Sequence, residues 1–153
     1  GELGRGIRYR VEEAPETLVE DGYRSTARLF SGAEPPPDAI YCVGDHLALG
    51  VLDWLREHGM DDPGKISVVG GSGNLEGAQG ETLTAIRPPY EAVGKAMVTL
   101  LLKTLEEAGR PQPAVYLPCT FRLGASTTAE ENALLTASHA PGGTSSTVPN
   151  RAT

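Results

Sequence analysis

Short apolar runs alternate along the chain with longer stretches in which apolar residues recur at helical spacing. The clearest case is an apolar run at 39–43, a tight loop at Gly44 and Asp45, and a helical pattern over 47–55. Three prolines precede the run and mark its start, because proline is excluded from the interior of a sheet. This stretch predicts a buried strand followed directly by an amphipathic helix.

Similar units lie on both sides of this stretch. Strands are predicted at 7–11, 66–69, 84–86 and 115–119, and helices at 18–30 and 90–107. Strand–helix units in series are typical of a parallel sheet with right-handed crossover connections. The expected fold class is therefore α/β, a sheet covered by helices.

The pattern dissolves from Ser126 onward. Residues 140–153 are rich in Ser, Thr, Gly and Pro, a composition that cannot bury enough apolar surface to fold. We therefore expect one domain over residues 1–127 and a disordered tail over residues 128–153.

Composition narrows the functional classes. A chain of 153 residues is long enough for one modest core, and its net charge of −7 has the wrong sign for gripping nucleic acid. No run of about 20 apolar residues is present, so no membrane partner is expected. Cys42 and Cys119 fall in predicted strands, and we interpret both as small core residues of a cytoplasmic protein.

Three segments carry a resemblance to a known family. They are Ala-Ile-Tyr-Cys-Val-Gly-Asp-His-Leu-Ala-Leu-Gly at 39–50, Asp-Pro-Gly-Lys-Ile-Ser-Val-Val-Gly at 62–70 and Leu-Thr-Ala-Ile-Arg-Pro-Pro-Tyr-Glu-Ala-Val-Gly at 83–94. In order and spacing they resemble the lactose-repressor/galactose-repressor (LacI/GalR) family of bacterial transcription regulators. The resemblance covers roughly residues 7–127 and corresponds to the C-terminal lobe of the effector-binding domain.

The resemblance implies a fold and a function. The fold would be a parallel-sheet α/β sandwich, one lobe of a two-lobed periplasmic-binding-protein-like (type I) sensor. A sugar or related small molecule would bind between the lobes and shift a homodimer between DNA-binding and released arrangements. Operator DNA would be read only by an N-terminal helix-turn-helix that, like the N-terminal lobe, we expect outside this sequence. We expect no enzymatic activity and no cofactor.

Five positions are predicted to line the effector site. Relatives place Asn at the position of Gly44, an aromatic residue at Gly71 and Asp at Ser72; a further stacking aromatic aligns near Thr17. At position 45 the chain keeps the Asp that is typical of the effector side in relatives. N-capping of the following helix is at least as good an interpretation of Asp45. Tyr90 is the fifth candidate, with packing as its alternative role. A site stripped of these polar and aromatic groups is expected to bind an ordinary hexose poorly.

The resemblance also implies a dimer contact through the helix that follows Asp45. The matching residues are His46, Leu49, Gly50 and Asp53, and their expected contact is isologous, with the same patch on both subunits.

Other functions have weaker support. An extracytoplasmic sugar-binding protein of a transporter shares the fold and is the main alternative. A nucleotide- or flavin-dependent enzyme ranks lowest, because the glycine-rich segment 70–77 lacks both the G-x-G-x-x-G spacing and a Lys-Ser/Thr pair. No His, Cys or carboxylate spacing indicates a metal site or a catalytic pair.

Overall fold

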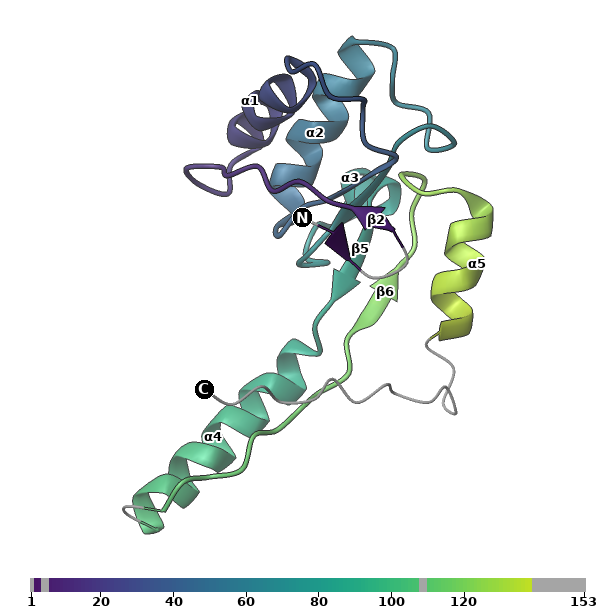
Figure 1. Cartoon of the computed structure of the whole chain (residues 1–153). Coiled ribbons are helices and arrows are strands. Elements are labelled where there is room, and N and C mark those ends of the chain that lie inside the picture. The colour runs from purple at the N-terminus through teal and green to yellow at the C-terminus, as the bar shows by residue number, and fades with distance from the viewer. Residues whose placement is uncertain (1, 4–5, 108–109, 139–153) are drawn as a thin grey trace.

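A computed structural model describes residues 2–3, 6–107 and 110–138 of the chain (Figure 1). The main sheet has four strands in the order β3-β4-β5-β6. β3 (Ala39–Tyr41), β4 (Ser67–Gly70) and β5 (Thr84–Arg87) are parallel, with Ile40 opposite Val68 and Val69 opposite Thr84. The predicted α/β class with a mostly parallel sheet is therefore confirmed.

Two expectations about strands were wrong. The segment 115–119 is not a strand, and the chain instead forms β6 (Thr120–Arg122), which runs antiparallel to β5. The period-two pattern at 7–11 yields only β2 (Ile7–Arg8), paired with β1 (Glu2–Leu3) in a separate hairpin. Both segments alternate in polarity, but alternation does not specify a pairing partner.

α1 (Val19–Phe30) and α2 (Asp45–Glu57) pack closely on each other, and α2 packs on β4. Two glycines permit the approach of the helices. A Cβ on Gly22 would lie 2.1 Å from the carbonyl oxygen of Leu47, and one on Gly50 would lie 1.9 Å from that of Val19. The core is made of Cys42, Leu47, Ala48, Val51, Leu52, Trp54, Leu55, Ile66, Val68, Leu83 and Ala85.

α4 (Tyr90–Glu106) leaves the body of the lobe. In Figure 1 it runs away from the sheet, and residues 110–119 return beside it to β6. We call α4 and residues 110–119 the arm. No residue of α4 is buried, and Met97, Leu101 and Leu105 are 65%, 59% and 69% exposed. The predicted helix is confirmed, but its apolar face is exposed or only partly buried. Cys119 is likewise exposed, contrary to expectation, because the return segment has no covering layer.

The C-terminal segment corrects the expected tail. Residues 129–138 form α5 (Ala129–Ser138), whereas residues 139–153 lie outside the described residues. Thr128 and Glu131 form a capping box: Glu131 Oε2 accepts from Thr128 N at 2.7 Å, and Glu131 N donates to Thr128 Oγ1 at 3.2 Å. The Oγ of Ser67 lies 2.7 Å from the same carboxylate oxygen and fastens α5 to β4. These bonds, from Ser67 first and then from Thr128, lower the pKa of Glu131.

Thr128→Ala is expected to destabilise the lobe by about 1 kcal/mol, because it removes the hydroxyl half of this capping box. Urea unfolding measures the loss, and faster amide exchange confined to α5 locates it. Thr136→Ala is the matched control, since that hydroxyl bonds a carbonyl inside the exposed part of α5. Equal effects of the two substitutions would contradict the role of the cap.

Candidate functional site

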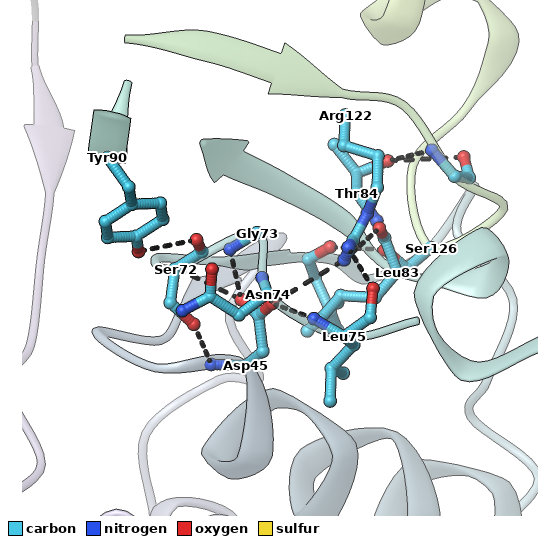
Figure 2. Close-up of polar contacts among 12 residues, drawn as sticks. Asp45, Ser72, Gly73, Asn74, Leu75, Leu83, Thr84, Tyr90, Arg122 and Ser126 are labelled. Carbon is cyan, nitrogen blue, oxygen red and sulfur yellow. Dashed lines mark hydrogen bonds and ion pairs between the residues drawn. The ribbon is translucent and has the colours of Figure 1, made fainter. Parts of the chain in front are cut away.

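The carboxyl ends of β3, β4 and β5 lie at one edge of the sheet because the three strands are parallel. α2 begins shortly after β3, the 72–75 loop follows β4, and α4 begins shortly after β5. In open α/β sheets this edge is where ligands bind. Tyr90 Oη donates to the carbonyl oxygen of Ser72 at 2.8 Å, which joins the third segment to the second (Figure 2).

Asp45 organises this edge. Its side chain is 1% exposed and accepts four backbone hydrogen bonds from the 72–75 loop. Oδ1 accepts from Ser72 N at 3.0 Å and Gly73 N at 3.1 Å, and Oδ2 from Asn74 N at 2.9 Å and Leu75 N at 3.4 Å. Asp45 N donates in turn to Ser72 Oγ at 3.2 Å. The carboxylate and the loop therefore hold each other in place, as Figure 2 shows.

Helix capping by Asp45 is not observed. Gly44 is the N-cap residue, and Asp45 is the first residue of α2. Its carboxylate turns instead to the loop amides. Burial alone would raise the pKa of Asp45, but the hydrogen bonds from the loop amides of Ser72, Gly73 and Asn74 outweigh it and hold that pKa below its usual value. A carboxylate has about four acceptor positions, so little capacity is left for a ligand hydroxyl.

Gly71 has no room for the aromatic side chain that relatives place there. A Cβ at Gly71 would lie 2.6 Å from the carbonyl oxygen of Val43 and 2.8 Å from Tyr41 Oη. Tyr41 is the last residue of β3 and is 58% exposed. An aromatic ring is therefore present at this edge, but β3 supplies it. Sequence reasoning missed Tyr41, although an aromatic residue ending a strand just before Gly44 was a usable signal.

The structure brings the predicted effector residues together. Asp45, Ser72 and Tyr90 are joined by hydrogen bonds, and Gly71 lies beside them in sequence. Thr17 also lies here, with its Cβ 4.0 Å from the position of a Cβ on Gly44. Contact of an effector with the five predicted residues, Gly44, Asp45, Gly71, Ser72 and Tyr90, is still a prediction.

The residues predicted for a dimer contact divide into two groups. His46, Leu49 and Asp53 follow helical spacing on a side of α2 that is exposed or partly exposed. Gly50 is buried against α1, at Val19 and Tyr23, so it belongs to the helix pair and not to an intersubunit surface.

Arg122 of β6 is a second residue that sequence reasoning missed. Nη1 donates to the carbonyl oxygen of Leu75 at 2.6 Å, and Nη2 lies 3.6 Å from Asp45 Oδ2. No local pattern in the sequence connects Arg122 with either partner, since both contacts depend on β6 pairing with β5.

A surface hollow and the thiol of Cys42 both lie outside the predicted effector and dimer sites. A hollow of about 540 Å³ lies between the last turns of α1 and α2, with Phe30, Trp54 and His58 among its lining residues. It is at the other end of α2 from the strand ends. Burial raises the pKa of the Cys42 thiol to about 12, with a smaller effect from Asp45, so Cys42 is a core residue as expected.

Within the described residues, no group of three or more His, Cys, Asp or Glu side chains is arranged to hold a metal ion. Across the same part of the chain, none of the helices combines the length and the hydropathy that crossing a bilayer requires.

The lobe has the architecture of open α/β domains, in which ligands bind at the carboxyl ends of the parallel strands. The sequence profile of the periplasmic binding protein-like domain matches residues 3–127. The chain belongs to this family, and the resemblance recognised in the sequence is confirmed.

The curated relatives are transcription regulators. The HTH-type transcriptional repressor PurR of Vibrio campbellii is 36% identical over 80 residues, which are 51% of this chain and 24% of the repressor. The regulator MalR of Streptomyces coelicolor is 37% identical over 84 residues, 52% of this chain and 24% of MalR. The chain thus spans about a quarter of the length of these relatives.

Solved structures agree with this assignment. A LacI-type regulator from Bifidobacterium animalis matches 80% of this chain and 45% of its own, with 25% identity and a TM-score of 0.65. A LacI family regulator from Enterococcus faecium, solved with bound ribose, matches 72% of this chain and 40% of its own, with 25% identity and a TM-score of 0.53.

Proposed function

We propose that this chain is the effector-sensing and dimerising part of a LacI-type DNA-binding transcription regulator. The observation that carries the proposal is the ordered edge of the sheet, where Asp45, the 72–75 loop and Tyr90 are joined by hydrogen bonds. Such an edge supplies one wall of a ligand cleft. The matching relatives are regulators, and they supply the functional class.

The proposed ligand is a small molecule held between this wall and a second lobe. Tyr41 and Val43 present exposed apolar surface at the edge, while Ser72 and Tyr90 supply polar groups. Carboxylates are well suited to accept hydrogen bonds from two neighbouring sugar hydroxyls, but the carboxylate of Asp45 has little acceptor capacity left. An ordinary hexose is therefore expected to bind weakly to this lobe alone.

The exposed apolar surface of the arm is a reason to propose that a second lobe packs against it. A 17-residue helix without a buried residue leaves its apolar face in water, and helices gain most of their stability from packing such a face. Val115 and Tyr116 of the return segment add exposed apolar area. In the proposed regulator, the arm is covered by the second lobe, which also completes the cleft.

The proposed homodimer contact uses the stripe of His46, Leu49 and Asp53 on α2. Leu49→Lys is expected to weaken self-association at least tenfold, because an isologous contact places the new charge near its own copy. Sedimentation at increasing protein concentration measures the effect. Val11→Lys, at an exposed apolar residue remote in sequence from α2, is the control. An unchanged association constant in Leu49→Lys would exclude this stripe as the interface.

Sequencing the DNA upstream of the codon for Gly1 tests the proposed function most directly. An in-frame lobe preceded by a helix-turn-helix would establish a DNA-binding regulator with this chain as part of its sensor. A secretion signal followed by a lobe would make it the binding protein of a transporter, and would overturn the proposal.

A further inference from the structure

The 72–75 loop is held at both ends by residues at the base of the arm, Tyr90 as its first residue and Arg122 shortly after its last. At its start, the carbonyl oxygen of Ser72 accepts from Tyr90 Oη at 2.8 Å, and Tyr90 is the first residue of α4. At its end, the carbonyl oxygen of Leu75 accepts from Arg122 Nη1 at 2.6 Å, and Arg122 lies in β6, where the chain returns from the arm. The chain therefore enters and leaves the arm through residues bonded to one loop (Figures 1 and 2).

The guanidinium of Arg122 lies among three acceptors. Besides Leu75, Nη2 lies 3.5 Å from the carbonyl oxygen of Leu83 and 3.6 Å from Asp45 Oδ2, and the side chain is only 19% exposed. A guanidinium is planar and its donors have fixed directions, so a shift of β6 must change these contacts together. Nε is buried and has no hydrogen-bond partner among the described residues, which destabilises this position of the guanidinium and favours its displacement when the strand shifts.

The loop passes any shift to α2. Its four amides bond the carboxylate of Asp45, which is the first residue of that helix. Of the four amides that bond Asp45, those of Asn74 and Leu75 lie nearest in the chain to the Leu75 carbonyl, so its displacement would move them first, and both donate to Asp45 Oδ2. A continuous chain of bonds thus joins the arm, the candidate ligand edge and the helix that carries the proposed dimer stripe.

We propose that Arg122, assisted by Tyr90, couples the position of the arm to the conformation of the 72–75 loop. Arg122 is a positioning residue: it acts on the ligand edge through the loop and need not touch the ligand. The inference rests on the proposed function, in which the second lobe grips the arm and the loop lines the cleft. Closure of the lobes would then move the arm, and through Arg122 and Tyr90 it would change the conformation of the 72–75 loop that lines the cleft.

Cys119 makes the coupling measurable in the chain as it stands. It is exposed at the end of the arm, three residues before Arg122, while the only other cysteine, Cys42, is buried. A bulky maleimide placed on Cys119 perturbs the return segment. We expect labelling to shift the amide NMR signals of residues 72–75, and we expect that shift to fall at least threefold in Arg122→Gln. Arg122→Lys, which keeps the charge and one donor direction, should restore part of it.

Arg56→Gln is the control, because Arg56 is an exposed arginine of α2 paired with Asp53, and it should leave the response unchanged. A merely structural role of Arg122 would alter the unlabelled spectrum without reducing the response to the label. A full response in Arg122→Gln, or none in the unsubstituted chain, would overturn the proposal. If Arg122→Gln does not fold, Tyr90→Phe applies the same test at Ser72, where the response should shrink.

This experiment contains no ligand and no second lobe. A failed response would therefore leave the regulator assignment standing. Conversely, a secretion signal upstream of Gly1 would remove the regulator assignment and leave the measured coupling intact.

Discussion

Gly50→Ala is expected to lower the free energy of unfolding by about 3 kcal/mol, the upper part of the range for overpacked interiors. A Cβ at this position would lie 1.9 Å from the carbonyl oxygen of Val19 and 2.6 Å from Tyr23 N. Both neighbours are backbone atoms of α1, so no side-chain rotation relieves the clash. The two helices must separate, which opens the packing around Val51 and Trp54 in the core.

Urea unfolding followed by circular dichroism measures this loss. Gly94→Ala is the matched control: Gly94 lies inside α4, nothing approaches its Cβ position within 4 Å, and alanine is the better helix former by about 1 kcal/mol. The pair separates the cost of steric overlap from the effect of helix propensity. If Gly50→Ala unfolded at the same urea concentration as the unsubstituted chain, the close helix crossing would be wrong.

Asp45→Asn is expected to cost about 3 kcal/mol and to loosen the 72–75 loop. The amide has nearly the shape of the carboxylate, but it keeps one acceptor oxygen and presents an NH₂ group to two backbone N–H donors. Unsatisfied buried donors cost about 1–3 kcal/mol each. Arg122 Nη2, 3.6 Å from Oδ2, also loses its charged partner. Faster amide exchange at Ser72 to Leu75 locates the effect, and Asp61→Asn is the control, because Asp61 pairs with Arg56 at the surface and surface ion pairs contribute about 0–1 kcal/mol.

The same carboxylate predicts a pH dependence. The pKa of Asp45 in the folded lobe lies below its unfolded value, because the loop amides outweigh the opposing effect of burial. The carboxylate therefore contributes its full stabilisation above the unfolded pKa of about 4, and that contribution is lost as the pH falls through the lower, folded pKa. Asp45→Asn should lack this part of the acid loss. Parallel stability–pH curves for the two proteins below pH 4 would contradict the assignment.

The local sequence was enough to predict much of this lobe. The apolar run at 39–43 and the helical face from Leu47 to Leu55 correspond to β3 and α2, and the runs near 66–69 and 84–86 correspond to β4 and β5. These elements are set by side-chain periodicity and chain breakers, which act over a few residues. The order of strands and helices also predicted the candidate ligand edge at the carboxyl ends of the parallel strands. A signal for α5 was also present, since Thr128-x-x-Glu131 is a capping-box pattern, but it was missed.

Asp45 shows where local reasoning ends. An aspartate at the start of a helix can cap it only from the N-cap position. Asp45 lies one position later, as the first residue of α2, so its carboxylate is free for other partners. Its actual partners are amides 27 to 30 residues later in the chain. Only the pairing of β3 with β4 brings those amides to the carboxylate.

By itself, the sequence determined the family and the α/β class and predicted a candidate ligand edge, because periodicity and motif spacing can be read along the chain without its tertiary contacts. Only the tertiary structure decided that α4 projects as an arm, that β6 is antiparallel and that Arg122 reaches Leu75 and Asp45. An apolar helix face indicates that burial is needed, but not which surface supplies it. Contacts between residues far apart in the chain depend on the whole fold, and no local pattern encodes them.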